Sequence, residues 1–302
     1  MEFSHEPVLT KQILNHLNIT KGDWHIDMTA GGGGHLDLAL GLGVNCFALD
    51  QDQDSFAFLI DKYKKLGWKE LSTTENMVSF EKKDQKLNIV NSNFENFDKY
   101  IHEQKFKSVL FDFGMSSYQI EGSKRGFSFM RDEVLDMRMD NNLTITAKDL
   151  INVLSVNELG DLFNRYGEDR FSKMYAREIV KVRKIKGITT TKELADLIVR
   201  VCPVKERKKL HPATRIFQAL RIAVNDELHS IQITLPKIAL ALETEGRILT
   251  LTFHSLEEKL VTESTTERSD LNISTETYQP DEQEVIANPR SRSARLTVLQ
   301  IN

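Results

Sequence analysis

Short apolar runs alternate with helical spacing along the first 115 residues. Buried parallel strands have such continuous apolar runs, and here they cover 24–28, 44–49, 87–90 and 108–111. Helical periodicity predicts helices after Gly34, over 54–66 and from Phe94 to about His102. The polar, aperiodic segment 67–86 is interpreted as a surface excursion. This alternation predicts an α/β fold with a right-handed, parallel, doubly wound sheet.

A different pattern begins near Ser116. After a glycine-containing, charged loop, helical spacing predicts helices over 147–153, 156–166, 170–184, 192–202 and 213–228. The fourth begins with a capping box, Thr190-x-x-Glu193. Another helix near 235–242 precedes a strand over 247–253 and two β-like segments, 272–278 and 294–301. We therefore expect a helical insert over 121–213 within an α/β domain formed by 1–120 and 214–302.

The charge distribution supports this division. The chain carries a net charge of −4, but residues 121–215 hold 20 Lys and Arg against 14 Asp and Glu. Within 165–215 the excess is 15 against 6. A basic block in an acidic protein predicts an anionic partner such as RNA. A lysine-rich, solvated helix face is the alternative.

Other features of the composition indicate a cytoplasmic protein without a membrane partner. No apolar run approaches the roughly 18 residues of a membrane span. The N-terminal segment has no secretory signal, and two cysteines give neither a disulfide framework nor a metal cluster. We therefore expect no metal.

Candidate chemistry is concentrated at the ends of the predicted strands. The sequence WHIDMTAGGGGH ends a strand with four glycines, Gly31–Gly34, which suit close approach of a ligand to the backbone at a helix N-terminus. Asp50 ends the second strand, where a carboxylate can accept hydrogen bonds from both hydroxyls of a ribose. Phe94 follows the third strand and suits an adenine face, and Asp112 closes the fourth. Helix capping by Asp50 and core packing by Phe94 are the structural alternatives.

The glycine pattern discriminates between nucleotides. Leu36 stands where a dinucleotide fingerprint needs its last glycine, and no phosphate-binding P-loop motif is present. S-adenosylmethionine has no pyrophosphate, and its ammonium and sulfonium groups favour nearby carboxylates. It is therefore the favoured ligand, and an NAD-dependent oxidoreductase is the alternative.

Several longer motifs carry a family resemblance. They are HEPVL from His5, DFGMSSYQ from Asp112, RGFSFMRDEVLDMRMD from Arg125, HPATRIFQALRI from His211, TFHSLE from Thr252 and NPRSRSA from Asn288. With these motifs the chain resembles, over essentially its whole length, the MraW/RsmH methyltransferases, which modify the N4 amine of a cytosine in bacterial 16S ribosomal RNA.

The resemblance implies a Rossmann-like class I S-adenosylmethionine-dependent methyltransferase sheet with an inserted helical domain for RNA recognition. It implies cofactor contacts at Gly33, Gly34, His35, Asp50, Phe94, Asp112 and Gln119, of which His35 and Gln119 follow from the resemblance alone. Gly31 and Gly32 depart from the usual single bulky residue before the paired glycines, which predicts a looser turn.

Methylation of an amine requires alignment of the nitrogen with the sulfonium methyl and removal of a proton. We expect backbone carbonyls and Ser116 or Ser117 to hold the amine, with Phe113 or a loop aromatic near the base; His254 is the rival general base. Neither Cys46 nor Cys202 lies in the loop after the fourth strand, which favours direct transfer without a covalent enzyme intermediate.

The expected partner is 16S rRNA in the decoding region, within the small ribosomal subunit. The insert offers cations for its phosphates, namely Arg170, Arg177, Lys181, Arg183, Lys184, Arg207, Lys208, Lys209 and Arg215. Arg125, Arg131, Arg138 and Arg215 are equally well interpreted as structural ties to Asp132, Asp136 and Asp140. A non-catalytic assembly factor is a further alternative, and monomer and homodimer both remain open.

Overall fold

The computed structural model describes residues 7–207, 211–266 and 273–301. Its contacts divide the chain into two compact units. The sheet unit comprises residues 1–116 and 228–302, and the helical unit comprises residues 117–227.

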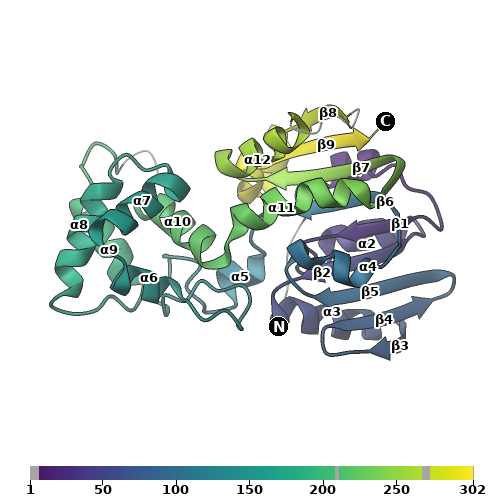
Figure 1. The fold of residues 1–302 in the computed structure, drawn as a ribbon, viewed down its shortest axis with the longest axis horizontal. Coiled ribbons are helices and arrows are strands. Elements are labelled where there is room, and N and C mark those ends of the chain that lie inside the picture. The colour runs from purple at the N-terminus through teal and green to yellow at the C-terminus, as the bar shows by residue number, and fades with distance from the viewer. Residues whose placement is uncertain (1–6, 208–210, 267–272, 302) are drawn as a thin grey trace. The chain divides into compact units, whose positions relative to one another are not determined.

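The sheet unit is built on five parallel strands. Their order across the sheet is β5 (Gln85–Asn91), β2 (Asn45–Asp50), β1 (Trp24–Asp27), β6 (Phe106–Asp112) and β7 (Leu242–Thr252). Antiparallel β9 (Arg295–Ile301) follows β7, and β8 (Ile273–Tyr278) pairs antiparallel with β9 (Figure 1). The strand order reverses beside β1, which creates the switch point at which α/β sheets bind ligands. The predicted α/β class is confirmed.

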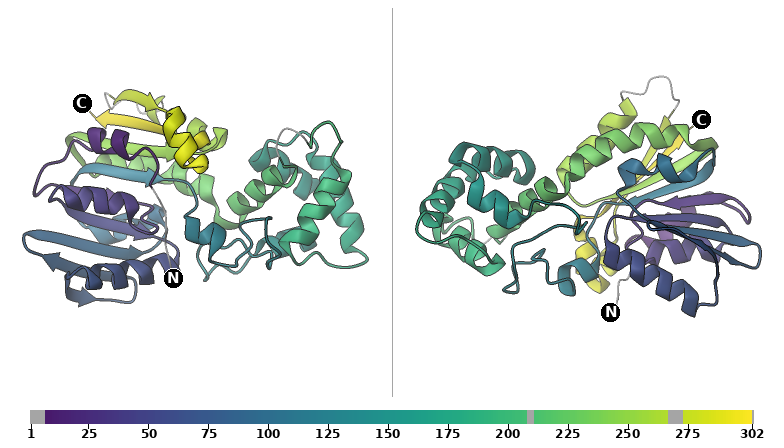
Figure 2. Two further views of the ribbon diagram at one scale, coloured as in Figure 1. Left: turned by 180° about the vertical axis from the view of Figure 1, so that it is seen from behind. Right: turned by 60° about the horizontal axis from the view of Figure 1, so that its bottom comes forward.

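Helices cover both faces of this sheet (Figure 2). One hydrophobic cluster joins the sheet to α1 (Thr10–His16), α2 (Gly34–Gly41) and α3 (Gln53–Lys65), through buried side chains such as Ile13, Leu36 and Leu59. The other joins the sheet to α4 (Asp98–Ile101), α11 (Glu227–Leu240) and α12 (Ser255–Thr266), through Ile101, Ile231 and Val261. Short helices η1 (Phe94–Asn96), α13 (Glu282–Ala287) and η2 (Pro289–Ser293) complete the unit.

The surface excursion predicted for 67–86 is wrong. This segment forms β3 (Lys69–Thr73) and β4 (Met77–Lys82), a hairpin that pairs antiparallel with β5 and extends the sheet. Val78 and Phe80 face the core and are buried, whereas every residue of β3 is exposed. The polar edge strand obscured the short alternation in β4 that identifies a half-buried strand.

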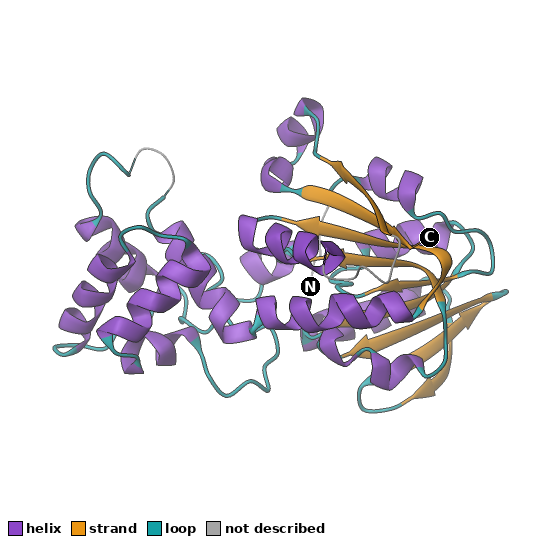
Figure 3. Ribbon diagram, turned by 45° about the horizontal axis from the view of Figure 1, so that its top comes forward, coloured by secondary structure: helices purple, strands orange, loops and turns teal. Residues whose placement is uncertain are grey.

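The described part of the helical unit consists of helices joined by loops (Figure 3). The helices are α5 (Ser117–Glu121), α6 (Ala147–Val153), α7 (Val156–Gly167), α8 (Ser172–Arg183), α9 (Thr191–Val201) and α10 (Ala213–Asn225). Capping boxes start α6, α7 and α9, including the predicted pair Thr190 and Glu193. The predicted insert ends at 213, whereas α10 packs against α6, α7 and α9 and lies in the same compact unit.

The loop before α6 is held by two arginines. Arg138 forms a bidentate pair with Asp136, at 2.7 and 2.8 Å, and donates to the Leu143 carbonyl at 2.6 Å. Arg125 donates to the Met139 carbonyl at 2.9 Å. The predicted tie to an aspartate is therefore confirmed for Arg138, and Arg125 has a structural contact to a backbone carbonyl. Arg131 likewise donates to a carbonyl, that of Glu121.

Candidate functional site

The glycine turn between β1 and α2 has a backbone conformation that requires glycine. Gly33 is the N-cap of α2 with φ of +75°, and Gly31 has φ of +50°. A Cβ atom at Gly33 would lie 2.8 Å from Leu59 Cδ2 and 3.0 Å from Lys62 Nζ. Gly34 then begins the helix, whose first N–H groups have no partner within it. The turn therefore brings backbone amides to the carboxyl edge of the sheet.

Asp50, at the end of β2, fastens this turn. Its Oδ2 accepts a hydrogen bond from Gly31 N at 2.7 Å, and its Oδ1 accepts one from Asp52 N at 2.8 Å. Burial, reinforced by the neighbouring Asp52, raises the pKa of Asp50 to about 7. A carboxylate has about four acceptor positions. Asp50 thus keeps capacity to accept hydrogen bonds from ligand hydroxyls.

A buried histidine lies among carboxylates beside the turn. His35 is 93% buried, with Nε2 at 3.6 Å from Asp112 Oδ2, and neither of its ring nitrogens has a hydrogen-bond partner within the described chain. Asp27 is also buried, and burial raises its pKa to about 6, opposed by the nearby His35. Buried polar groups normally have partners. An unpartnered imidazole here is consistent with a polar ligand in this site.

Asp112 and Phe94 stand at the same sheet edge. Asp112 ends β6; its N–H donates to Thr29 Oγ1 at 2.6 Å, and its Oδ1 accepts from Gly114 N at 3.2 Å. Phe94 follows β5 and is half-buried, with its ring edge-on to Phe111 at 5.6 Å. The structure thus brings together the glycine turn, His35, Asp50, Phe94 and Asp112.

The loop after β6 contains the predicted amine-binding residues. Ser116 lies beside the glycine turn, because a Cβ at Gly31 would be 3.7 Å from Ser116 Cβ. Ser117 and Gln119 are buried on α5, which belongs to the helical unit. Phe113 is buried against Phe111, with ring centres 5.3 Å apart.

His254 has a structural role at the start of α12. Its Nδ1 accepts a hydrogen bond from Glu257 N at 3.3 Å, and its Nε2 lies 2.8 Å from Glu257 Oε1. Glu257 is buried, and its Oε2 accepts from Phe253 N at 2.7 Å. Because Glu257 Oε2 also accepts from His254 N at 3.3 Å, this is the reciprocal arrangement of a capping box, with histidine in place of serine or threonine. Nδ1 of His254 thus has a structural hydrogen bond, whereas its buried Nε2 makes no hydrogen bond within the described residues.

The predicted RNA-binding cations fall into two groups. Arg183, Arg207 and Arg215 donate to backbone carbonyls that include those of Leu154, Cys202 and Glu168, respectively. Arg177, Lys181 and Lys184 are exposed on or next to α8. Lys208 and Lys209 lie outside the described residues. The three arginines with carbonyl contacts have structural roles that the charge pattern could not reveal. The three exposed cations on or next to α8 remain accessible to a partner.

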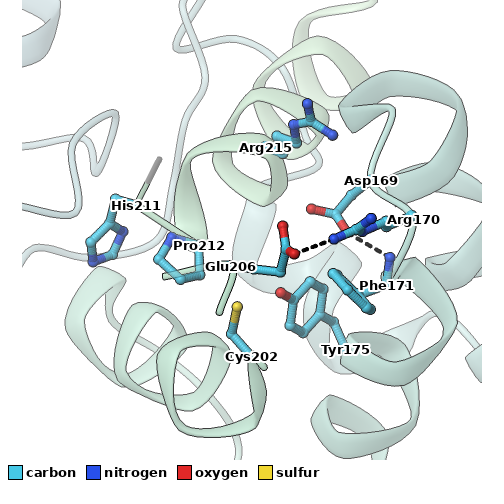
Figure 4. A pocket seen from close by; sticks show the side chains of 9 residues that line it. All are labelled: Asp169, Arg170, Phe171, Tyr175, Cys202, Glu206, His211, Pro212 and Arg215. Atoms are coloured by element: carbon cyan, nitrogen blue, oxygen red, sulfur yellow. Dashed lines mark hydrogen bonds and ion pairs between the residues drawn. The ribbon is translucent and has the colours of Figure 1, made fainter. Parts of the chain in front are cut away.

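Arg170 and Arg215 line a pocket within the helical unit (Figure 4). Its volume is about 280 Å³, and aromatic and acidic side chains share it. Arg170 pairs with Glu206 and lies over the Phe171 ring at 4.7 Å. Its charge is thus balanced inside the unit.

The described part of the chain also bears on metal, membrane and cysteine chemistry. There, no group of three or more His, Cys, Asp or Glu side chains could hold a metal ion. None of the described helices has the length and apolar character needed to cross a membrane. Cys46 and Cys202 are both buried, and burial raises the pKa of Cys46, which disfavours its thiolate.

Fold and site together define a class. The parallel strands have the order β5-β2-β1-β6-β7, and antiparallel β9 lies between β7 and β8. This order is that of the Rossmann-like sheet of the class I methyltransferases. The chain belongs to the MraW methylase family, whose model matches residues 2–302.

Relatives of known name cover nearly the same length. The chain is 37% identical to "Ribosomal RNA small subunit methyltransferase H" of Sulfurihydrogenibium sp. (strain YO3AOP1), over 97% of this chain and 98% of that protein. It is 40% identical to the protein of the same name from Trichormus variabilis (strain ATCC 29413 / PCC 7937), over 99% of this chain and 92% of that protein. The family resemblance noted in the sequence is confirmed.

Proposed function

We propose that this protein uses S-adenosylmethionine to methylate the N4 amine of one cytosine in the decoding region of small-subunit 16S rRNA. The observation that carries the proposal is the cluster of glycine turn, His35, Asp50 and Asp112 at one sheet edge of an MraW-family methylase. The names of the relatives support small-subunit rRNA as the substrate. The choice of N4 rests on the family resemblance.

The residues at the sheet edge fit the proposed cofactor. S-adenosylmethionine supplies an electrophilic methyl group on a positively charged sulfur. Asp50 would accept from the ribose hydroxyls, and Phe94 would pack against the adenine. Gly33, Gly34, His35 and Asp112 would hold the methionine part. The unpartnered buried His35 and the three carboxylates Asp27, Asp50 and Asp112 support a ligand that carries both donors and positive charge.

The protein must align the N4 nitrogen and accept its proton. Ser116 and Ser117, with backbone carbonyls of the loop after β6, would bind the amine, and Phe113 would support the base. Nδ1 of His254 accepts from the Glu257 backbone at the start of α12, which favours the loop as the location of the acceptor. Burial of both cysteines supports direct transfer without a covalent enzyme intermediate.

The helical unit would bind the RNA. A cytosine must leave its stack to reach a methyl donor. The exposed cations Arg177, Lys181 and Lys184 would contact phosphates beside the target. Arg183, Arg207 and Arg215 would instead maintain the helical scaffold, since each donates to backbone carbonyls.

The decisive test uses small subunits from cells that lack this protein. Incubation with the purified protein and S-adenosylmethionine should add one methyl group to one cytosine of 16S rRNA, and mass analysis of nuclease fragments should place it on N4. Cofactor binding without methyl transfer would favour a non-catalytic assembly factor. Binding of NAD in its place would favour an oxidoreductase.

The same assay tests the amine-binding residues. Ser116→Ala or Ser117→Ala should lower turnover while the affinity for S-adenosylhomocysteine stays close to that of the unmodified protein. Unchanged turnover in both variants would remove the serines from the mechanism.

A further inference from the structure

Lys62 of α3 reaches across to the glycine turn. Its Nζ lies 3.0 Å from the Gly32 carbonyl, 3.3 Å from the Gly33 carbonyl and 2.6 Å from Asp37 Oδ2. A lysine ammonium has three N–H donors and no acceptor. These three oxygens therefore match its full hydrogen-bonding capacity. The Lys62 side chain is 19% exposed, and that of Asp37 is 44% exposed.

The partner carboxylate is itself fixed. Asp37 lies in the first turn of α2, and its Oδ1 accepts a hydrogen bond from the hydroxyl group of Tyr63 at 2.8 Å. Tyr63 is buried and is the neighbour of Lys62 on α3. The pair Lys62–Asp37 thus ties α3 to the first turn of α2 directly beside the glycine turn.

These contacts help to fix the direction of the peptide groups of the turn, together with α2, whose Asp37 N also donates to the Gly33 carbonyl at 3.0 Å. A trans peptide group is planar, so its C=O and the following N–H point in opposite directions. Because the Gly33 carbonyl faces Lys62, the Gly34 N–H faces away from Lys62. The Gly32 carbonyl also faces Lys62, and the next N–H, that of Gly33, donates to the Ala30 carbonyl at 2.7 Å. Lys62 thus acts on the carbonyl side of the turn, and Asp50 fixes the N–H of Gly31.

We propose that Lys62 is a positioning residue for the cofactor, which holds the two glycine carbonyls so that the turn presents its free amide to the methionine part of the ligand. The inference rests on the proposed function, because it takes S-adenosylmethionine as the ligand. It also gives the extra glycine Gly32 a side-chain partner in the turn.

The test compares two lysines of the same helix. Lys62→Met removes all donors and keeps the length of the side chain, and Lys65→Met is the matched control. Lys65 pairs with Asp61 at 2.6 Å, and both side chains are exposed. Calorimetry with S-adenosylhomocysteine should give a Kd that rises about tenfold or more for Lys62→Met, since charge-assisted hydrogen bonds to the turn are lost. Lys65→Met should bind as the unmodified protein does.

Two further readouts separate positioning from a purely structural role. In the methylation assay, Lys62→Met should raise KM for S-adenosylmethionine while kcat at saturation changes little. Lys62→Arg retains charge and donors in a planar fork and should recover part of the affinity. Asp37→Asn leaves Lys62 and both glycine carbonyls in place and should weaken binding less than Lys62→Met does. It replaces Lys62→Met as the test if Lys62→Met does not fold.

A wild-type Kd in Lys62→Met would overturn the inference. So would equal losses in Lys62→Met and Lys65→Met, or an Asp37→Asn variant with wild-type affinity if Lys62→Met does not fold. Failure of the unmodified protein to bind S-adenosylhomocysteine would instead overturn the proposed function, so the two outcomes are distinguishable.

Discussion

Asp50 is subject to two opposing influences. Burial and Asp52 favour its neutral form and raise its pKa to about 7, whereas the amides of Gly31 and Asp52 favour the carboxylate. A positively charged ligand whose hydroxyl groups donate to Asp50 would also favour the carboxylate. The protonation state of this one residue therefore links ligand binding and folding to pH.

We expect cofactor affinity to rise with pH. Binding to the ionised form releases a proton from Asp50, so affinity should increase by up to about fivefold between pH 6 and pH 7 and level off above the pKa. Calorimetric titration at pH 6, 7 and 8 in buffers of different ionisation enthalpy measures both the affinity and the proton released. Asp50→Asn should bind weakly with a flatter profile. A wild-type affinity that is constant over this range would contradict the assignment.

The free energy of unfolding of the ligand-free protein should decrease as pH rises. An aspartate of the unfolded chain ionises near pH 4, so between about pH 4 and pH 7 the folded protein retains a proton that the unfolded chain has lost. Asp50 therefore contributes stability that is full below about pH 4 and is lost as pH rises through about 7. Denaturant unfolding should show a smaller decline over this range for Asp50→Asn, and an equal decline in both proteins would exclude Asp50 as its source.

Gly33 tests the strain argument at the turn. Gly33→Ala places a Cβ 2.8 Å from Leu59 Cδ2 at φ of +75°, and the expected cost is about 1–3 kcal/mol in the free energy of unfolding. Cofactor binding should weaken as well. Gly41→Ala, at the end of the same helix, meets nothing within 4 Å and serves as the control. Denaturant unfolding measures both variants, and equal stability would refute the strain.

At the scale of elements, sequence patterns correctly predicted the helices and strands whose positions depend on local residues. The capping box at Thr190 marked the start of α9, and the apolar run before Asp112 marked β6. The hairpin β3–β4 was missed because β3 lies at the sheet edge with all its residues exposed. The contacts of Lys62 and Arg183 join segments that are distant in sequence. In the sequence each is one charged residue within a helical pattern, and this pattern does not indicate the partner.

Two neighbouring cations of the helical unit should behave differently. Arg183 donates to the carbonyls of Ile151, Val153 and Leu154 at the end of α6, so Arg183→Met should lower the free energy of unfolding by about 1–3 kcal/mol. Lys184 is exposed, and Lys184→Met should leave stability unchanged and weaken RNA binding. Denaturant unfolding and RNA titration on the same two variants check both statements. If Lys184→Met lowered stability and Arg183→Met only weakened RNA binding, Lys184 would have the structural role and Arg183 the RNA contact.

At the scale of the whole molecule, the chain separates two kinds of chemistry by charge. Residues 121–215 hold an excess of basic side chains in an otherwise acidic protein, and the carboxylates of the candidate cofactor site belong to the sheet unit. The sequence therefore indicated a basic helical unit more easily than its boundary, because charge is visible in composition. The boundary depends on α10, whose packing against α6, α7 and α9 is a tertiary property.

This separation predicts that RNA binding and cofactor binding respond differently to salt. Each phosphate contact contributes about 0.7–0.9 to the slope of log affinity against log salt, so the combined variant Arg177→Ala, Lys181→Ala and Lys184→Ala should reduce the slope by about 2–3. The three side chains are exposed on or next to α8, which limits the effect of their removal on folding. RNA titrations from low to moderate salt measure the slope, and S-adenosylhomocysteine affinity should be the same in both proteins. A slope that does not change would place the RNA contacts on other residues, since the number of neutralised phosphates alone sets its value.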